Sequence, residues 1–112
     1  MDGENIKVVE RYLDALRKKD LRRAPIAGEI IFANAITGKG AGAENFRAFL
    51  SGFLPAMKDL KIICHICQGE YVATRWEALT EFGLIEIGEF FRVENGEITE
   101  SFSYFDPRPI LS

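Results

Sequence analysis

Several features that mark particular protein classes are scarce or absent in this sequence of 112 residues. It has only two cysteines and one histidine, and no apolar run approaches the roughly 20 residues that span a bilayer. The N-terminus lacks the basic region and apolar core of a secretory signal. The sequence therefore predicts a cytoplasmic protein without membrane spans, whose core needs no disulfide bonds.

The sequence also lacks a large excess of positive or negative charge. Lysine and arginine together number 14 against 17 aspartates and glutamates, which gives a net charge of −3, and no basic block occurs. This balance argues against nucleic acids and anionic membranes as partners. Hydrophobic residues make up 47% and charged residues 28%, as in globular proteins, so we expect residues 1–112 to form one domain.

Cys64 and Cys67 form a C-x-x-C motif that has two functional interpretations. A redox pair normally opens a helix, whereas this motif lies in a β-rich run, where residues three apart point to opposite faces. A zinc site needs further cysteines or histidines, and His65 is the only histidine. The sequence therefore favours two small buried side chains in a strand, and predicts no metal and no cofactor.

The first half of the chain has helical periodicity. Apolar residues recur at helical spacing over residues 6–16, which predicts an amphipathic helix that begins near Asn5 and buries the ring of Tyr12. A short helix is expected at residues 21–26. Residues 44–54 place phenylalanines and leucines on one face, which predicts a third helix that ends near Pro55.

The second half of the chain alternates with period two. A short strand at residues 30–32 and a glycine-rich loop at 37–43 precede the last helix. Four longer strands with tight connections then form a meander, at residues 61–67, 71–80, 84–94 and 97–105. The fold class is therefore α+β, with N-terminal helices packed on one face of a curved antiparallel sheet. The tail from residue 107 is too short for a further element.

Glu89 interrupts an otherwise apolar strand face that it shares with Ile85 and Ile87. A carboxylate there is unfavourable unless it is paired, protonated or beside a water-filled cavity, and burial alone raises its pKa. A structural ion pair, or a face that meets solvent, is the alternative. On the preceding strand, Arg75 and Glu77 share one face and either hold each other in a pocket or form a solvated surface pair.

The order of these elements resembles the nuclear-transport-factor-2-like fold over nearly the whole chain. Within that superfamily the sequence is most similar to limonene-1,2-epoxide hydrolase. The similarity rests on Tyr12-Leu13-Asp14-Ala15-Leu16, Asn34, Thr74-Arg75-Trp76-Glu77-Ala78-Leu79, Gly96-Glu97-Ile98-Thr99 and Tyr104-Phe105-Asp106-Pro107-Arg108. The resemblance implies a cone with a pocket between helices and sheet, and a homodimer.

The hydrolase resemblance also implies roles for individual residues. In that family one carboxylic acid protonates an epoxide while a second carboxylate activates water. By position Arg75 matches the arginine that bridges the two, Glu77 the acid and Asn34 a water-holding asparagine. Phe32 replaces a tyrosine of the family, and Ser103 stands where the second carboxylate belongs, so the resemblance leaves the base unassigned.

Glu89 is a candidate for that displaced carboxylate, and the sequence also has a partial likeness to ketosteroid isomerases. There Glu89 matches an acid that donates a hydrogen bond to an oxyanion, and Tyr12 matches the oxyanion-hole tyrosine. The proton-abstracting aspartate of those isomerases has no counterpart, because residues 30–43 contain no Asp or Glu. A steroid isomerase is therefore not expected.

The leading hypothesis is a cofactor-independent enzyme that performs acid–base chemistry on a hydrophobic small molecule. Epoxide hydrolysis is its most specific form, and a related isomerase- or cyclase-type reaction is included. The catalytic candidates are Glu77, Arg75, Asn34 and Glu89, and the substrate-binding candidates are Tyr12, Phe32, Leu79, Ile85, Ile87 and Ser103. A non-catalytic binding module is the alternative. A third hypothesis is an interaction module whose outer sheet face pairs through Trp76, Phe90, Phe102 or Tyr104.

Overall fold

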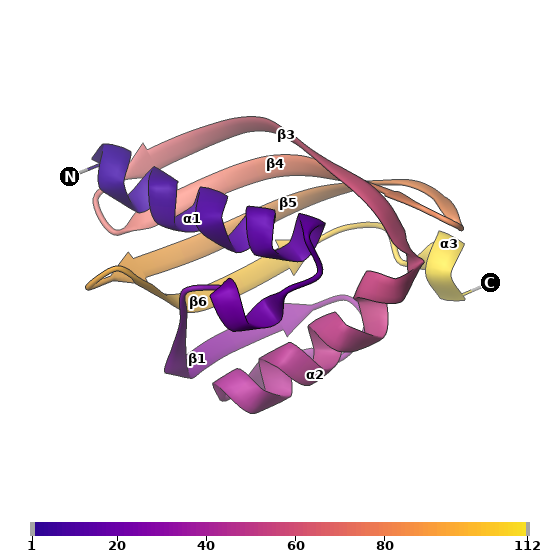
Figure 1. Ribbon diagram of the computed structural model, residues 1–112, viewed down its shortest axis with the longest axis horizontal. Helices are drawn as coiled ribbons and strands as arrows, with labels where there is room; N and C mark the ends of the chain where they lie inside the picture. The colour runs from indigo at the N-terminus through magenta and orange to yellow at the C-terminus, as the bar shows by residue number, and fades with distance from the viewer. Residues whose placement is uncertain (1, 112) are drawn as a thin grey trace.

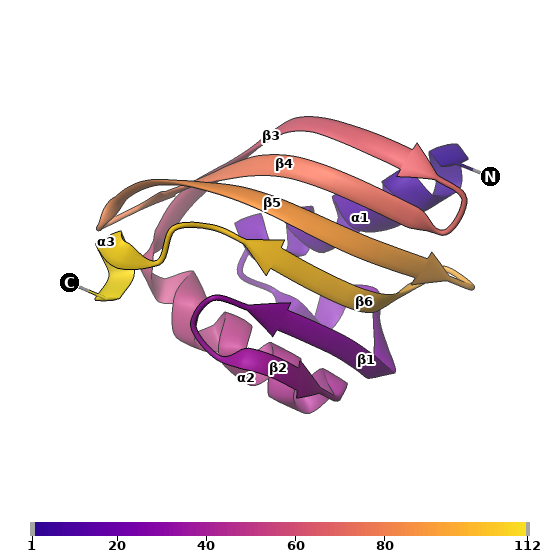
Figure 2. The same ribbon diagram turned by 180° about the vertical axis from the view of Figure 1, so that it is seen from behind.

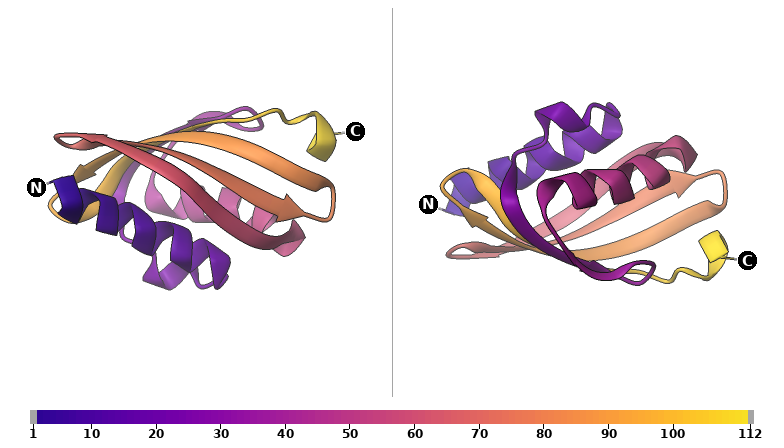
Figure 3. Two further views of the ribbon diagram at one scale, coloured as in Figure 1. Left: turned by 90° about the horizontal axis from the view of Figure 1, so that it is seen from above. Right: turned by 90° about the horizontal axis from the view of Figure 1, so that it is seen from below.

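Two helices lie on one face of a curved sheet in the computed structural model, which describes residues 2–111 (Figure 1). Helix α1 (Asp2–Arg17) and helix α2 (Ala43–Phe53) both cover the concave face, as the views along the sheet show (Figure 3). The opposite face is seen in Figure 2. This arrangement confirms the predicted α+β class, with the helices on one side of the sheet.

The sheet has six strands in the order β2-β1-β6-β5-β4-β3. Their bounds are β1 (Ile26–Asn34), β2 (Gly38–Ala41), β3 (Met57–Gln68), β4 (Tyr71–Thr80), β5 (Gly83–Glu94) and β6 (Glu97–Tyr104). Strands β3 to β6 form the predicted antiparallel meander. Strand β1, however, pairs in parallel with β6, so the sheet is mixed rather than purely antiparallel. The intervening helix and hairpins supply the long crossover that a parallel pair requires.

The N-terminal connections differ from the prediction in detail. The expected helix at residues 21–26 is a single 3₁₀ turn, η1 (Leu21–Arg23), and β1 already begins at Ile26. Part of the expected glycine-rich loop is strand β2, which pairs with β1. Gly40 faces the ring of Phe32 across this pair, so the glycine serves close packing rather than a loop.

The segment after α2 and the tail after β6 also differ from the prediction. After α2 the chain makes a second 3₁₀ turn, η2 (Leu54–Ala56), which contains Pro55. The tail forms a short helix, α3 (Arg108–Leu111), although no element was expected there. Its Ile110 is partly buried against the core, which gives this one turn a hydrophobic contact.

The core lies between the helices and the concave face of the sheet. Helix α1 contributes Val9, Leu13 and Leu16 at the predicted spacing, and the ring of Tyr12 is buried as expected. Tyr12 packs edge-on against Phe91 of β5, with ring centroids 5.4 Å apart. The helical periodicity of the sequence therefore identified the buried face of α1. Within residues 2–111 no helix is long and apolar enough to cross a membrane.

The C-x-x-C motif lies in strand β3, as predicted, but its two cysteines have different environments. A β-bulge at Ile63 shifts the register between Ile62, which pairs with Trp76, and Cys64. The bulge turns Cys64 to the outer face, where it is exposed, while Cys67 is partly buried. The expectation that both side chains are buried is therefore wrong for Cys64.

The close approach of β2 to Phe32 makes Gly40 sensitive to substitution. A Cβ atom on Gly40 would lie 2.5 Å from Cζ and 2.8 Å from Cε2 of the Phe32 ring. We expect Gly40→Ala to lower the free energy of unfolding by about 1–3 kcal/mol, because the ring cannot move without disturbing its packing on Phe46. Gly28→Ala, whose Cβ would meet nothing within 4 Å, is the control in urea unfolding. Equal stability of the two variants would contradict this account.

Candidate functional site

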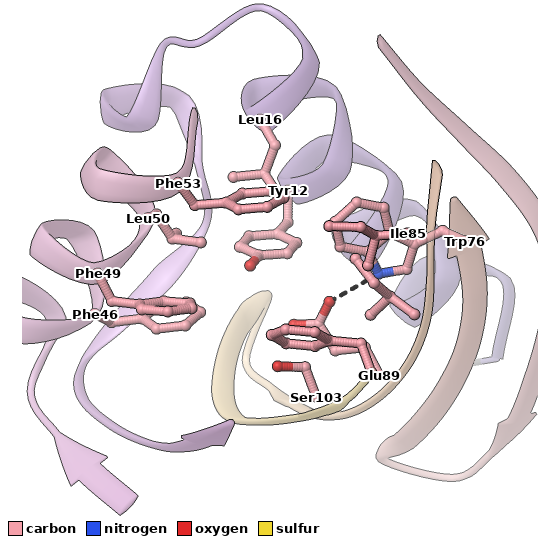
Figure 4. Close-up of a pocket in the computed structure, with 12 residues that line it drawn as sticks. Tyr12, Leu16, Phe46, Phe49, Leu50, Phe53, Trp76, Ile85, Glu89 and Ser103 are labelled. Carbon is pink, nitrogen blue, oxygen red and sulfur yellow. Dashed lines mark hydrogen bonds between the residues drawn. The ribbon is translucent and has the colours of Figure 1, made fainter. Parts of the chain in front are cut away.

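An apolar cavity of about 30 Å³ lies between the two long helices and the concave face of the sheet (Figure 4). Its walls come from α1, α2, β4, β5, β6 and the segment after β6, with the lining residues Tyr12, Leu16, Phe46, Phe49, Leu50, Phe53, Trp76, Ile85, Ile87, Glu89, Ser103 and Phe105. A water molecule needs about 10–15 Å³ of such space, so the cavity holds one or two waters. A larger ligand must displace side chains or extend beyond it.

Glu89 is the one carboxylic acid among these lining residues, and it is 3% exposed. Its Oε1 atom accepts a hydrogen bond from Nε1 of Trp76 at 3.0 Å, and its Oε2 atom lies 2.5 Å from the hydroxyl oxygen of Ser101. No lysine, arginine or histidine within residues 2–111 acts on this carboxyl group. Neutral donors rather than a cation therefore hold Glu89 in place.

Burial raises the pKa of Glu89 from 4.5 to about 7, although hydrogen bonds from Ser101, Trp76 and Tyr12 oppose the rise by stabilising the charged form. Both protonation states are therefore populated near neutral pH. A carboxyl group with such a pKa can accept a proton from a bound molecule and return it. Burial without a cation is the cause of this property.

Tyr12 acts on the same carboxyl group from helix α1. Its pKa is raised well above 10, first by burial and then by the charge of Glu89 and their hydrogen bond. The Tyr12 hydroxyl therefore stays protonated at neutral pH and serves as a hydrogen-bond donor. Figure 4 shows this hydroxyl on the cavity side of the ring.

Ser103 lies directly across from Glu89 in the pairing of β5 with β6. Its side chain lines the cavity, is partly exposed and points into the space in front of the Glu89 carboxyl group (Figure 4). The Ser103 hydroxyl makes no hydrogen bond with any residue between 2 and 111. It is therefore available to a molecule in the cavity.

The structure brings together five of the residues that the sequence singled out. Tyr12, Ile85, Ile87, Glu89 and Ser103 all line the cavity, which places both Tyr12 and Glu89 at one site. Phe32 is buried as well, but it packs behind Phe46, with ring centroids 5.0 Å apart, and is not part of the wall. Phe32 is therefore a supporting residue rather than a contact residue.

The expected pocket positions of Arg75, Glu77 and Leu79 are not what the structure shows. Strand β4 turns alternate residues inward, and its buried residues are Val72, Thr74, Trp76, Ala78 and Thr80. Arg75 instead lies on the outer face, where it pairs with Glu86 at 3.6 Å and both side chains are more than half exposed. Leu79 is 47% exposed on the same face. The bridging and acid roles carried over to Arg75 and Glu77 therefore do not fit.

Asn34 is buried, yet its side chain is occupied within the turn between β1 and β2. Its Oδ1 atom accepts hydrogen bonds from the backbone N–H groups of Ile36 and Thr37, both at 2.9 Å. Its Nδ2 atom donates to the hydroxyl of Thr37 at 2.9 Å. Asn34 therefore closes a turn and is not placed to hold a water in the cavity.

Two residues that hold Glu89 were not identified as site residues from the sequence. Trp76 was expected on the outer sheet face, but it is 4% exposed on the inner face and binds Glu89. Ser101 is 2% exposed and belongs to the inward set with Ser103. The alternation of residues along β4 and β6 assigns Trp76 and Ser101 each to one face of its strand. It does not show which of the two faces is the inner one.

Comparisons with known proteins give one family and many structures of the same fold. Residues 9–101 match the family model described as SnoaL-like domain. An LEH-like epoxide hydrolase from M. tuberculosis is 21% identical with a TM-score of 0.78, covering 98% of this chain and 88% of that chain. An NTF2-like protein of unknown function from Cytophaga hutchinsonii is 22% identical with a TM-score of 0.80, covering 96% and 95% respectively.

A candidate ketosteroid isomerase from Kribbella flavida is 14% identical with a TM-score of 0.84, covering 94% of this chain and 79% of that chain. At identities this low, the three similarities show a shared NTF2-like fold. A search of curated proteins found no significant match.

The raised pKa of Glu89 predicts a specific dependence of stability on pH. The folded protein binds a proton at Glu89 more tightly than the unfolded chain, so this contribution is fully present below pH 4.5 and is lost as pH rises through 7. At about 1.4 kcal/mol for each unit of pKa, the loss amounts to about 3 kcal/mol. We expect Glu89→Gln to abolish this part of the pH dependence.

The measurement is urea unfolding from pH 4 to pH 8, followed by the fluorescence of Trp76, the only tryptophan. Glu86→Gln is the matched control, because Glu86 lies on the outer face with its side chain 65% exposed. The control should keep the pH dependence of the unsubstituted protein. An unchanged pH dependence in Glu89→Gln would show that Glu89 does not titrate in this range.

Proposed function

The chain belongs to the SnoaL-like domain family, and we propose that it is a cofactor-independent enzyme that moves a proton on a small apolar molecule. The observation that carries the proposal is Glu89, a buried carboxyl group with a pKa of about 7 in the wall of an apolar cavity. General acid–base catalysis is most efficient when the pKa of the catalytic group lies near the working pH, as it does for Glu89 at neutral pH. The proposal places the protein in the cytoplasm, without a nucleic-acid or membrane partner.

The reaction type that needs the fewest groups is the isomerisation of a carbonyl compound. The carboxylate of Glu89 takes a proton from a carbon next to the carbonyl group, and the electron pair of that C–H bond moves into an enolate. The hydroxyl of Tyr12 donates to the Glu89 carboxylate before the transfer, and it becomes available to the enolate oxygen once Glu89 has taken the proton and lost its charge. Where a C=C bond adjoins that carbon, the enolate extends over it as a dienolate. Glu89 then returns the proton to the far carbon of that bond, so the C=C bond moves next to the carbonyl group and atoms and electrons balance without a cofactor.

Epoxide hydrolysis is the second candidate, because the cavity has room for the water that this reaction consumes. A space of about 30 Å³ holds one or two waters beside Glu89. Glu89 would take a proton from water while the new C–O bond forms, and Tyr12 would give its proton to the epoxide oxygen as its bond to carbon breaks. The proton on Glu89 would then pass to Tyr12 through their hydrogen bond, which restores both groups. This reaction needs a separate acid and base, whereas isomerisation reuses one carboxyl group, so isomerisation is the first choice.

A non-catalytic binding module is the alternative in the same cavity. In that case Glu89 fixes the polar end of an apolar ligand through a hydrogen bond, and no bond is broken. The same ligands would bind, but they would leave the protein unchanged. Chemical turnover therefore separates the two functions.

We expect turnover to depend on Glu89. Purified protein is incubated at pH 8 with linear and cyclic ketones in deuterium oxide, and with alkyl and terpene epoxides in oxygen-18 water. Deuterium at carbon and labelled diol are then followed by NMR and mass spectrometry. Glu89→Gln should lower the rate by about 10²–10⁴-fold, because it removes the proton acceptor. The rate should rise with pH through about 7 as Glu89 loses its proton.

Glu86→Gln is the control, since Glu86 lies on the outer face of the sheet. Equal rates for Glu89→Gln and the unsubstituted protein would overturn the assignment of Glu89 as the acid–base group. Ligands that raise the melting temperature without deuterium exchange or diol formation would establish the binding module instead.

We also propose that the protein forms a homodimer through the outer face of the sheet (Figure 2). Ile66, Phe90 and Tyr104 are 71%, 57% and 61% exposed, and the last two rings pack edge to face. Exposed apolar groups of this kind on one face are typical of interfaces. Light scattering at micromolar concentration should give twice the mass of one chain.

Phe90→Glu should give a monomer by the same measurement, because it would place a charge within the interface. Leu111→Glu is the control, since Leu111 is 65% exposed in α3 rather than on a strand of the sheet. A monomer in the unsubstituted protein would refute the proposal.

A further inference from the structure

The inner cavity is too small to enclose a whole apolar substrate. Its volume of about 30 Å³ leaves room for a reacting group beside Glu89 but not for a hydrocarbon body. With the cavity walls in place, the rest of the substrate lies in a space that adjoins the cavity. A second hollow, of about 260 Å³, lies at the C-terminal ends of β1 and β6, and its lining residues are Ala33, Asn34, Ala35, Ser103, Tyr104 and Phe105. We call it the outer hollow.

The outer hollow exists because two parallel strands separate. The pairing of β1 with β6 ends at Ala33 and Phe102. Beyond this point β1 turns away at Asn34, whose side chain closes the turn, while β6 continues along β5 as far as Tyr104. The separation leaves a gap in the sheet beside the inner cavity.

Ser103 and Phe105 connect the two spaces, because both residues line the inner cavity as well as the outer hollow. Phe105 is only partly buried and follows the last residue of β6, so the sheet pairing of β6 does not hold it. Ser103 has an unengaged hydroxyl next to Glu89. The boundary therefore combines an aromatic ring that packs against the core from outside the strand pairing with a hydrogen-bonding group.

The contrast between Ser101 and Ser103 supports a ligand role for the second serine. Both serines lie on the inner side of β6, two residues apart. Ser101 is fully buried and bonds to the carboxyl group of Glu89. Ser103 reaches the same space but bonds to no residue between 2 and 111. The first serine positions the carboxyl group, and the second is left for a ligand.

Building on the proposed function, we infer that the substrate is an elongated apolar molecule with one carbonyl-type oxygen. The Ser103 hydroxyl donates a hydrogen bond to that oxygen, which places the neighbouring carbon in front of Glu89. The hydrocarbon tail passes Phe105 and lies in the outer hollow against Ala33 and Ala35. The outer hollow therefore sets the preferred length of the substrate.

The test uses straight-chain 2-alkanones from 2-butanone to 2-dodecanone, with binding measured through the fluorescence of Trp76, which lines the cavity. We expect the affinity to rise about fourfold for each methylene that enters the outer hollow. Ala35→Phe should remove this gain for the long ketones and leave the shortest ones unchanged, because it fills only the hollow. Ile36→Phe is the matched control, since Ile36 is the next residue of the turn and does not line the hollow.

Ser103 is tested with the same ketones. Ser103→Ala should weaken the binding of every ketone by about 2- to 10-fold, the loss expected for one hydrogen bond. Ser103→Thr keeps the hydroxyl and should restore the affinity. The pH midpoint of the Trp76 fluorescence should stay near 7 in both variants, because Ser103 does not bond to Glu89.

The possible results separate this inference from the proposed function. Affinity that is independent of chain length, or an equal effect of Ala35→Phe and Ile36→Phe, would overturn the role of the outer hollow while the chemistry at Glu89 stands. Equal affinities of Ser103→Ala and the unsubstituted protein would overturn the role of Ser103. If no ketone changes the fluorescence while Glu89-dependent epoxide turnover is observed, the carbonyl substrate is wrong and the acid–base site is right.

Discussion

The burial of one carboxyl group without a cation is the constraint on which the rest of the site depends. A charged carboxylate in an apolar interior is unfavourable, and it is usually paired with a lysine or arginine. Here Trp76 and Ser101 each donate to one oxygen of Glu89, and Tyr12 approaches from α1. Neutral donors stabilise the charge only in part, so the pKa settles near 7 rather than near its ordinary value. A cation in the same place would have lowered the pKa and removed the reactivity.

The sequence predicted the elements of this fold better than it predicted their faces. The apolar spacing in residues 6–16 and the period-two runs after residue 58 are local signals, and both correspond to what the structure shows. The choice between the two faces of β4 is different, because hydrophobic residues occur on both. Leu79 is 47% exposed on one face while Trp76 is buried on the other. Only the pairing with neighbouring strands and the contact with α1 decide which face is covered.

Long-range pairing explains the remaining differences. The parallel contact of β1 with β6 joins residues far apart in the chain, and no local pattern encodes it. The glycines of β2 suggested a loop, whereas Gly40 is needed because the ring of Phe32 lies against it. Asn34 shows that functional predictions have the same limit. An asparagine at this position matched a catalytic residue of the hydrolase family, but all the hydrogen bonds of its side chain lie within a turn. A residue type by itself therefore says little about a role until its partners are known.

The site also differs from a two-carboxylate arrangement in what it can do. Arg75 and Glu77 lie on the far side of the sheet, and Ser103 occupies the position across from Glu89, so Glu89 is the one residue lining the cavity that titrates near neutral pH. One group can remove a proton and return it, but it cannot at the same time protonate a leaving oxygen and deprotonate a water. A single acid–base group therefore favours a reaction in which the substrate keeps all its atoms, and isomerisation is the simplest reaction of that kind.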